Sequence, residues 1–333
     1  MAKSAKKNKG KSGGTADAGG NGSGGTGVKG AKGGGGKGVG SGAGVAAAAD
    51  VEDGSAATAF AVALRAGQGL TLSDLDPRST PGFSGGKAGA AALTASTDAE
   101  LDDLQERLYA ESRTGGTRAI LLVVQGMDTA GKGGIMRHVV GSVDPQGVAL
   151  AAFKKPTKEE LEHDFLWRIE KKLPEPGYIG VFDRSQYEDV LIARVRELAD
   201  VSEIERRYNA INEFEKRISD QGTRIVKVML HISSEEQRDR LMERLERPDK
   251  HWKYNPGDVD ERLLWDKYMD AYQLVFERTS TPWAPWYVVP ANHKWYARIA
   301  VQALLLDALE RVDPRWPAAT FDIEGEKARL AAS

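Results

Sequence analysis

The chain has 333 residues, a formal net charge of −2 at pH 7 and no cysteine. The lack of cysteine excludes disulfides and thiolate metal sites and fits a reducing compartment, so we predict a cytoplasmic protein. The first lysines are not followed by an apolar signal segment, and apolar runs such as 120–124 are far shorter than a membrane span. We therefore expect neither secretion nor membrane insertion.

Residues 1–58 are predicted to form a disordered tail. The first 50 residues contain 18 Gly, eight Lys, two Asp and no aromatic residue, too little apolar surface to offset the entropy cost of folding. These charges give the first 50 residues a net +6, so a total of −2 leaves residues 51–333 at about −8. A mildly acidic body argues against a domain that binds nucleic acid over a broad basic face. The tail itself is either a solvated extension or an accessory binder of polyanions.

Residues 59–118 are predicted to form an N-terminal extension and one helix. The segment 67–83 is rich in turn formers and carries scattered apolar residues, so we expect it to lie over the surface of the core. Leucines then recur at helical spacing from residue 98 until two glycines, Gly115 and Gly116, end the run.

Strand and helix patterns alternate through the next two hundred residues. Apolar runs typical of buried strands lie at residues 118–125, 148–153, 178–183, 225–232 and 286–290. Helical patterns lie between them at residues 135–140, 157–173, 190–198, 204–218 and onward from Ser233 or Ser234. A capping box formed by Thr157 and Glu160 supports the second of these helices. We predict one α/β core at 119–312 with a parallel sheet and helices on both faces, and a C-terminal extension at 313–333.

The first strand runs directly into residues 126–132, Gly-Met-Asp-Thr-Ala-Gly-Lys. This segment matches Gly-x-x-x-x-Gly-Lys, the P-loop pattern, in which backbone N–H groups surround phosphate oxygens and the lysine reaches the distal phosphates. A plain glycine turn is the alternative, but a strand before and a helix after the loop are the context that a P-loop requires. The pattern therefore predicts phosphate binding.

Two aspartates near this loop are candidate metal ligands. Gly133 follows Lys132 in place of the Ser or Thr that normally ligates magnesium in P-loop enzymes. Asp128 lies inside the loop, and Asp183 ends the third strand, at the position of a Walker-B aspartate. We predict that both bind Mg²⁺, with Mn²⁺ as a possible substitute. A turn-forming role for Asp128 and a helix-capping role for Asp183 are the alternatives.

Arg184 follows Asp183 and is predicted to clamp phosphate oxygens, since a guanidinium can form two parallel hydrogen bonds with them. A salt bridge to Glu188 or Asp189 is the alternative.

A second group of cations follows the fourth strand. Arg240, Arg244 and Arg247 fall on one helical face, and Lys250 and Lys253 lie in the break that follows. A helix, basic turn and helix at about 235–265 indicate a lid that closes over phosphates and excludes water. The alternative is a solvated helix in which nearby glutamates neutralise the arginines.

Several other side chains near this segment have competing interpretations. Trp252, Trp265, Tyr268 and Tyr272 lie at roughly helical spacing, which favours core packing over stacking on a base. We assign no catalytic role to His251, because transfer between phosphates begins from an oxygen that is already ionised.

Together these segments resemble the type-2 polyphosphate kinase family. The resemblance covers about residues 69–305 and rests on four ordered motifs, at 76–82, 125–134, 182–191 and 247–253. It implies a thymidylate-kinase-like P-loop fold, a three-layer α/β sandwich with a helical lid. It also implies magnesium-dependent, reversible transfer of the terminal phosphate of inorganic polyphosphate to AMP or ADP, with GMP and GDP as candidate acceptors. Gln186, where the family often has His, and the Gly/Lys-rich tail depart from its pattern.

The predicted site combines the motif residues with this resemblance. The catalytic residues are Asp128, Lys132, Asp183 and Arg184. The residues that bind phosphate or polyphosphate are Gly126, Gly131, Gly133, Gly134, Arg240, Arg244, Arg247, Lys250 and Lys253. The nucleotide-binding residues are Arg137, Glu188 and Asp189. The expected partners are polyphosphate, nucleoside mono- and diphosphates and further copies of the chain in a dimer or tetramer, with no membrane and no specific nucleic acid.

Two other functions stay open at this point. One is an ATP-dependent P-loop kinase that acts on a nucleotide or small metabolite, against which the loop aspartate and the missing Ser or Thr count. The other is a non-enzyme whose tail binds polyphosphate or nucleic acid. Deletion of residues 1–58 distinguishes them, because only the binding protein would lose its function with the tail.

Overall fold

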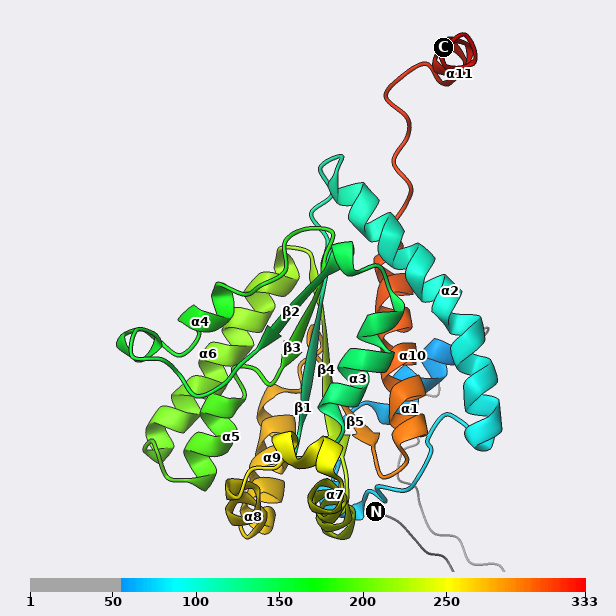
Figure 1. Cartoon of the computed structure of the whole chain (residues 1–333). Helices are drawn as coiled ribbons and strands as arrows, with labels where there is room; N and C mark the ends of the chain where they lie inside the picture. Colours follow the sequence, from blue (N-terminus) through cyan, green and yellow to red (C-terminus); the bar gives the residue numbers. More distant parts are fainter. Residues whose placement is uncertain (1–54) are drawn as a thin grey trace, which may run out of the picture. The chain divides into compact units, whose positions relative to one another are not determined.

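The computed structural model describes residues 55–333, and a parallel sheet of five strands forms its centre (Figure 1). The strands are β1 (Ala119–Gly126), β2 (Val148–Ala152), β3 (Ile179–Asp183), β4 (Thr223–His231) and β5 (Trp286–Pro290). Their order is β2-β3-β1-β4-β5, and each neighbouring pair is parallel. All five predicted strands are confirmed, and their ends shift by at most two residues.

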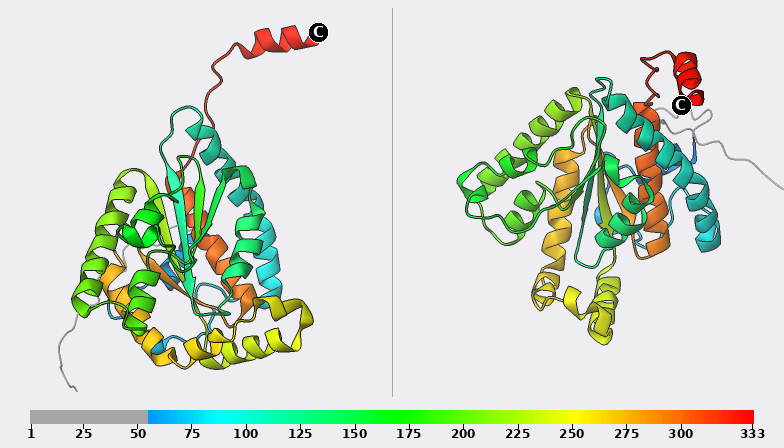
Figure 2. Two further views of the ribbon diagram at one scale, coloured as in Figure 1. Left: turned by 60° about the vertical axis from the view of Figure 1, so that its left-hand side comes forward. Right: turned by 45° about the horizontal axis from the view of Figure 1, so that its top comes forward.

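Helices cover both faces of this sheet (Figures 1 and 2). The described helices are α1 (Ala56–Leu64), α2 (Gly86–Ser112), α3 (Lys132–His138), α4 (Trp167–Glu170), α5 (Glu188–Val195), α6 (Val201–Asp220), α7 (Ser234–Glu246), α8 (Gly257–Arg262), α9 (Trp265–Thr279), α10 (Lys294–Val312) and α11 (Ile323–Ala331). Every residue of β1 is buried, as expected for a strand covered on both sides. Ile120 and Leu122 pack with α1, α2, α3 and α10, whereas Leu121 and Val123 pack with α5, α6 and α9. The predicted three-layer α/β sandwich is confirmed.

A helical segment after β4 lies beyond the carboxyl ends of the strands (Figure 2). It consists of α7, the 3₁₀ helix η5 (Pro248–Lys253) and α8, after which α9 returns the chain to the sheet. Ser233 caps α7 as predicted, since its side chain accepts a hydrogen bond from the Glu236 N–H at 3.2 Å. Residues 234–262 coincide with the segment predicted as a lid, and we refer to them as the lid.

The helix predicted at 157–173 is wrong. Its capping box does form: the Thr157 N–H donates to Glu160 Oε2 at 2.7 Å, and the Glu160 N–H donates to Thr157 Oγ1 at 3.2 Å. The box supports only one 3₁₀ turn, because His163 is extended and Asp164 Oδ1 then accepts from the Leu166 N–H at 3.1 Å. This second side-chain bond starts a new turn, and only the short helix α4 follows.

The N-terminal helices extend further than predicted. Helix α2 starts at Gly86, twelve residues before the predicted position, because the alanine-rich residues 86–97 lack an apolar period. Helix α1 starts at Ala56, so the tail boundary at residue 58 is placed too late, and the tail up to residue 54 lies outside the described residues. The segment 67–83 follows the core as predicted, with Tyr296 Oη donating to the Pro81 carbonyl oxygen at 2.6 Å.

Helix α10 was not expected from periodicity, because it is buried around most of its circumference and so has no amphipathic stripe. Within residues 55–333, no helix has both the length and the apolar character that a membrane span needs.

Candidate active site

The loop between β1 and α3 has the geometry of a phosphate-binding loop. Gly126 (φ 149°) and Gly131 (φ 120°) have positive φ values that favour glycine. Packing also excludes a side chain at Gly126, because a Cβ there would lie 2.9 Å from the Leu230 carbonyl oxygen. Lys132 begins α3, and its Nζ donates to the Gly126 carbonyl oxygen at 2.7 Å. Burial lowers the pKa of Lys132, while the nearby Asp128 carboxylate opposes this shift.

The two predicted metal ligands line one cavity. Asp183 ends β3, which pairs with β1, and Asp128 follows β1 in the loop. Asp183 Oδ1 is buried and has no hydrogen-bond partner among residues 55–333. This arrangement is costly for a carboxylate unless a cation lies nearby. Because α5 begins only at Glu188, Asp183 is not a helix cap.

This pair fits a hard divalent cation. Mg²⁺ prefers oxygen ligands, is commonly held by one or two carboxylates and completes its shell with water and substrate phosphates. Within residues 55–333, no group of three or more His, Asp or Glu side chains is placed to hold a metal.

Arg184 lies between the loop and α5. Its guanidinium is 3.3 Å from Asp128 Oδ1 and 3.9 Å from Glu188 Oε2, and about a third of its side chain is exposed. The salt bridge to Glu188 that we considered as an alternative is therefore present. The contact with Asp128 nevertheless brings the guanidinium to the P-loop, where a phosphate can reach it.

A cavity of about 420 Å³ on one side of the loop is lined mainly by cations, and we name it the basic cleft. Its cationic side chains are Lys132, Arg137, Arg240, Arg244, Lys250, Lys253, Lys294 and Arg298. Gly131 of the loop and Gly133 and Gly134 of α3 line it as well, with Asp128, Asp183, His138 and Glu243. Arg137, which we predicted to bind nucleotide, thus lies among the predicted phosphate-binding residues.

Lys294 and Arg298 are absent from the sequence prediction because α10 itself was not expected. They lie one helical turn apart at the start of α10, directly after the last strand. Two cations at this spacing, just past the carboxyl end of a strand, are the signal that could have identified them.

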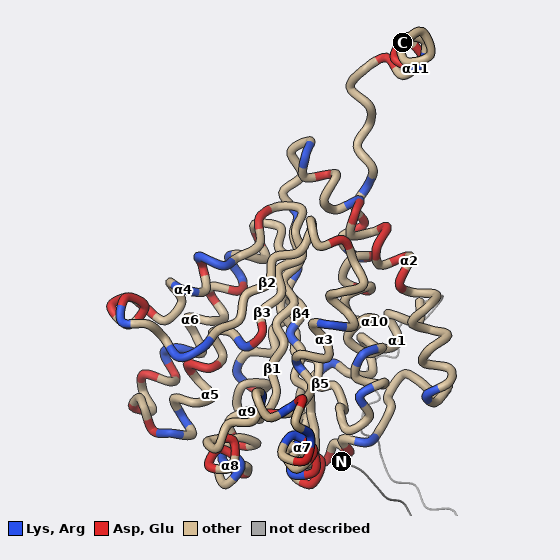
Figure 3. Tube along the Cα trace, in the orientation of Figure 1, with Lys and Arg blue, Asp and Glu red and all other residues tan. Residues whose placement is uncertain are grey.

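A second cavity, of about 260 Å³, shares Asp128 and has the opposite character, and we name it the acidic cleft. Among residues 55–333, its carboxylates are Asp128, Glu188, Asp258 and Glu261, and its one lining cation is Arg184. The other side chains that line it are Met127, Leu191, Ile192, Asn255, Tyr268 and Tyr272. Burial raises the pKa values of Glu188 and Asp258. Figure 3 shows the acidic residues of α8 and the mixed charges of α7.

The aromatic residues of this region divide into two groups. Tyr268 and Tyr272 are buried in a core cluster, as the core interpretation predicts, and both also line the acidic cleft. Tyr268 Oη donates to Glu261 Oε2 at 2.6 Å. Trp265 packs partly against the core, whereas Trp252 is 78% exposed on the lid and is not a core residue.

The structure corrects the prediction for Arg240. Its Nε donates to Glu236 Oε1 at 2.7 Å. Its four terminal N–H groups donate to backbone carbonyl oxygens, those of Thr129 (2.9 Å), Ala130 (3.0 Å), Ala291 (2.7 Å) and Asn292 (3.1 Å). Because a guanidinium has five N–H donors, none is left for a phosphate. Arg240 instead fastens the P-loop to the lid helix α7 and to the segment after β5.

Two further predicted residues lie outside both clefts. Arg247 pairs with Glu243 at 2.9 Å and with Asp249 at 2.9 Å, which matches the alternative of a self-neutralised lid surface. Asp189 pairs with Arg168 at 3.3 Å and lines neither cleft, so the structure does not place it for nucleotide binding. His251 is a lid residue as expected, with Nε2 2.9 Å from the Leu245 carbonyl oxygen.

Known proteins resemble this chain over most of the described core. A family model described as Polyphosphate kinase 2 matches residues 86–317. An AMP/ADP-polyphosphate phosphotransferase of Meiothermus ruber is 45% identical over 246 residues, which cover 74% of this chain and 91% of that protein. An ADP-polyphosphate phosphotransferase of Rhodopseudomonas palustris is 43% identical over 66% of this chain and 79% of its own length. The crystal structure of a polyphosphate kinase 2 from Arthrobacter aurescens matches with a TM-score of 0.82 and 60% identity, covering 83% of this chain and 98% of that one.

Proposed function

The chain belongs to the polyphosphate kinase 2 family, as its four motifs indicated, and we propose that it moves the terminal phosphate of inorganic polyphosphate to AMP or ADP. It is a phosphotransferase of the P-loop kinase fold. The Meiothermus ruber relative is named for both AMP and ADP, which supports both acceptors, while the Rhodopseudomonas palustris relative is named for ADP alone. GMP and GDP are further candidates.

The observation that best supports this proposal is the meeting of two unlike clefts at Asp128. The basic cleft offers a series of cations to a chain of phosphates, which carries a negative charge at every unit. The acidic cleft offers two tyrosines and apolar side chains to a base and ribose, and Arg184 to the attached phosphate. One phosphate can therefore pass between the two ligands beside the P-loop.

In the proposed reaction, an oxygen of the nucleotide's terminal phosphate attacks the last phosphorus of polyphosphate, and the bond to the next bridging oxygen breaks in line. The attacking oxygen is already ionised, so no general base is needed. Lys132 and Arg184 hold phosphate oxygens and offset the charge that spreads in the transition state. Asp128 and Asp183 would hold Mg²⁺ or Mn²⁺, which supplies further charge neutralisation when bound. The reaction runs in either direction according to the concentrations of its substrates.

A direct assay tests the proposal. Purified protein with magnesium, polyphosphate and either AMP or ADP, and no other phosphate donor, should produce ADP or ATP, and a chelator should abolish the product. No product from either acceptor contradicts the proposal. An ATP-dependent kinase, the main alternative, would instead convert ATP and AMP to ADP with no polyphosphate present.

Two aspects of the proposal are independent of this assay. We propose that the enzyme acts in the cytoplasm and forms a dimer or tetramer. Light scattering on the purified chain measures its mass in solution, and a monomer at assay concentration contradicts the second statement.

A further inference from the structure

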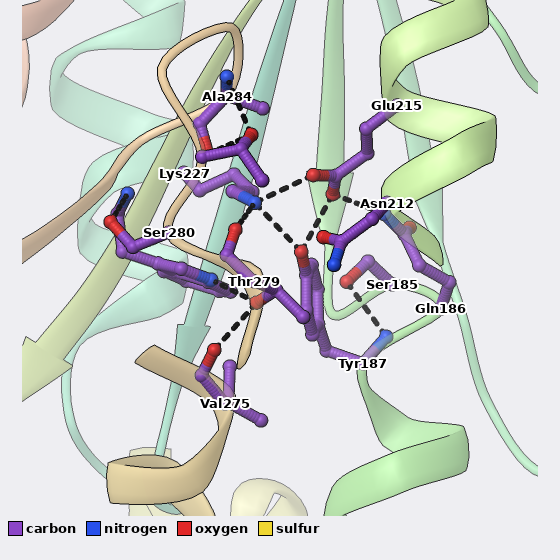
Figure 4. A network of polar contacts seen from close by, with 12 residues as sticks. Ser185, Gln186, Tyr187, Asn212, Glu215, Lys227, Val275, Thr279, Ser280 and Ala284 are labelled. Atoms are coloured by element: carbon purple, nitrogen blue, oxygen red, sulfur yellow. Dashed lines mark hydrogen bonds and ion pairs between the residues drawn. The ribbon is translucent and has the colours of Figure 1, made fainter. Parts of the chain in front are cut away.

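A closed network of polar groups is buried in the core, outside both clefts (Figure 4). Lys227 on β4 and Glu215 on α6 are fully buried, with Lys227 Nζ 2.6 Å from Glu215 Oε2. Nζ also donates to Tyr187 Oη and to the Thr279 carbonyl oxygen, both at 2.8 Å. Glu215 Oε1 accepts from Tyr187 Oη at 2.7 Å and from Gln186 Nε2 at 3.1 Å. All three N–H groups of Lys227 thus have a partner.

Stability alone does not account for this network. A buried ion pair repays its desolvation poorly, and apolar residues of similar size at such positions often leave stability unchanged or raise it. Burial lowers the pKa of Lys227 and raises that of Glu215, which is the sign of that cost. Buried polar groups that are paired do, however, fix one geometry. Lys227, Glu215 and the Tyr187 hydroxyl are paired in this way, whereas among residues 55–333 the buried Gln186 Oε1 has no hydrogen-bond partner. The role of the network therefore depends on which segment of the chain it holds in place.

Gln186 and Tyr187 belong to the turn that carries Asp183, Arg184 and Glu188. Arg184 has φ 65°, a left-handed backbone conformation. For a residue that carries a side chain this conformation raises the free energy, so it persists only where the surroundings enforce it. Before Arg184 the turn is held by β3, and the Arg184 N–H donates to the Val124 carbonyl oxygen at 3.1 Å.

After Arg184, the turn is held by the buried network. Besides its hydrogen bonds, Tyr187 packs its ring edge-on against Trp286, with ring centroids 4.7 Å apart. Release of Gln186 and Tyr187 would free the backbone at Arg184 to leave its left-handed conformation. The guanidinium would then move away from its position 3.3 Å from Asp128.

We propose that Tyr187 and Gln186, anchored by the Glu215–Lys227 pair, are positioning residues that hold Arg184 in the geometry required for phosphoryl transfer. The proposal rests on the proposed function, because transfer is the step for which Arg184 must be placed. Tyr187 itself touches neither cleft and acts only through the turn.

A pair of hydroxyl deletions tests this. Tyr187→Phe removes the network bonds of the phenol and keeps the ring packing. Tyr208→Phe is the matched control, because Tyr208 is buried in the same core cluster and its hydroxyl has no hydrogen-bond partner in residues 55–333. We expect kcat with polyphosphate and ADP to fall about tenfold in Y187F and less than about twofold in Y208F. KM for ADP should change little in either variant, whereas the unfolding temperature should fall in Y187F, because buried Lys227 and Glu215 each lose a hydrogen-bond partner.

A double-mutant cycle separates positioning from a general structural role. If Tyr187 acts through Arg184, Y187F should lower kcat less than about twofold in an Arg184→Lys background, where the guanidinium is already lost. Equal proportional losses in both backgrounds overturn the proposal.

The two proposals fail differently. A wild-type enzyme that does not transfer phosphate from polyphosphate contradicts the proposed function and the positioning role with it. An active wild-type enzyme in which Y187F and Y208F have equal kcat contradicts the positioning role alone.

Discussion

The two clefts share Asp128 but differ in almost every other respect. Eight cationic side chains line the larger basic cleft, whereas four carboxylates, one arginine and two tyrosines line the acidic cleft. A long polyanion is repelled from a surface dominated by carboxylates and attracted to the other. The contrast indicates that the P-loop forms the boundary between two binding surfaces, with Asp128 as the side chain common to both.

The largest expected effect follows from changing that common residue. Asp128→Asn keeps the size of the side chain and removes its charge, so the proposed metal ligand and a partner of Arg184 are lost together. We expect kcat with polyphosphate and ADP to fall about 10³-fold, with an unchanged unfolding temperature as the control for folding. Near-normal turnover would return Asp128 to the role of a turn former.

A smaller effect, on polyphosphate binding alone, is expected from substitutions in the basic cleft. Lys294→Ala with Arg298→Ala removes two of its cations without touching the loop. We expect KM for polyphosphate to rise about tenfold, KM for ADP to change less than about twofold, and the dependence of polyphosphate KM on salt to weaken. Equal changes in both KM values would show that the clefts do not separate the two substrates.

The corresponding substitution in the acidic cleft should affect binding of the nucleotide and not of polyphosphate. Glu261→Gln weakens the charged hydrogen bond that orients Tyr268. We expect KM for ADP to rise about threefold to tenfold, and KM for polyphosphate to stay constant. If the polyphosphate KM rises instead, the assignment of the two clefts is reversed.

The smallest expected effect is on stability, and it comes from the burial of the Glu188 carboxylate in the acidic cleft. Burial raises the pKa of Glu188 above 4.5, so the folded protein binds this proton more tightly than the unfolded chain does. The stability that this group contributes is therefore present below pH 4.5 and is lost as the pH rises through the folded pKa. Glu188→Gln should match the wild type in unfolding temperature at low pH and slightly exceed it at neutral pH. A lower value at neutral pH would mean that the Arg184 ion pair outweighs the cost of burial.

Most of the fold could be predicted from local patterns. The strands are short runs of apolar residues, and the P-loop lies where a strand meets a helix, so both are visible in sequence. Helix α10 could not be predicted from periodicity, because a helix buried on most sides has no polar face to mark its turns. The capping box at Thr157 was recognised correctly, but the equally local bond from the Leu166 N–H to Asp164, which starts a new turn, was overlooked.

The candidate site could be predicted where a short motif marks its residues, and not where residues of several elements come together without one. Asp128, Lys132, Asp183 and Arg184 belong to two motifs, and the structure brings them together. The acidic cleft draws on the loop, α5, α8 and α9, and the pattern of Tyr268 and Tyr272 is typical of core residues, which they also are. The role of Arg240 depends on carbonyl oxygens 51 to 111 residues away, and its sequence neighbours carry no sign of them.

The contacts of Arg240 also limit how the lid can move. Because its guanidinium joins α7 to carbonyl oxygens at residues 129–130 and 291–292, the first two turns of that helix cannot swing about Ser233 without breaking these bonds. If the lid opens as we propose, its hinge lies further along, where the extended backbone at Arg247 before Pro248 ends α7. Opening at that point would admit a long polymer from the side and leave the bonds between Arg240 and the phosphate-binding loop intact.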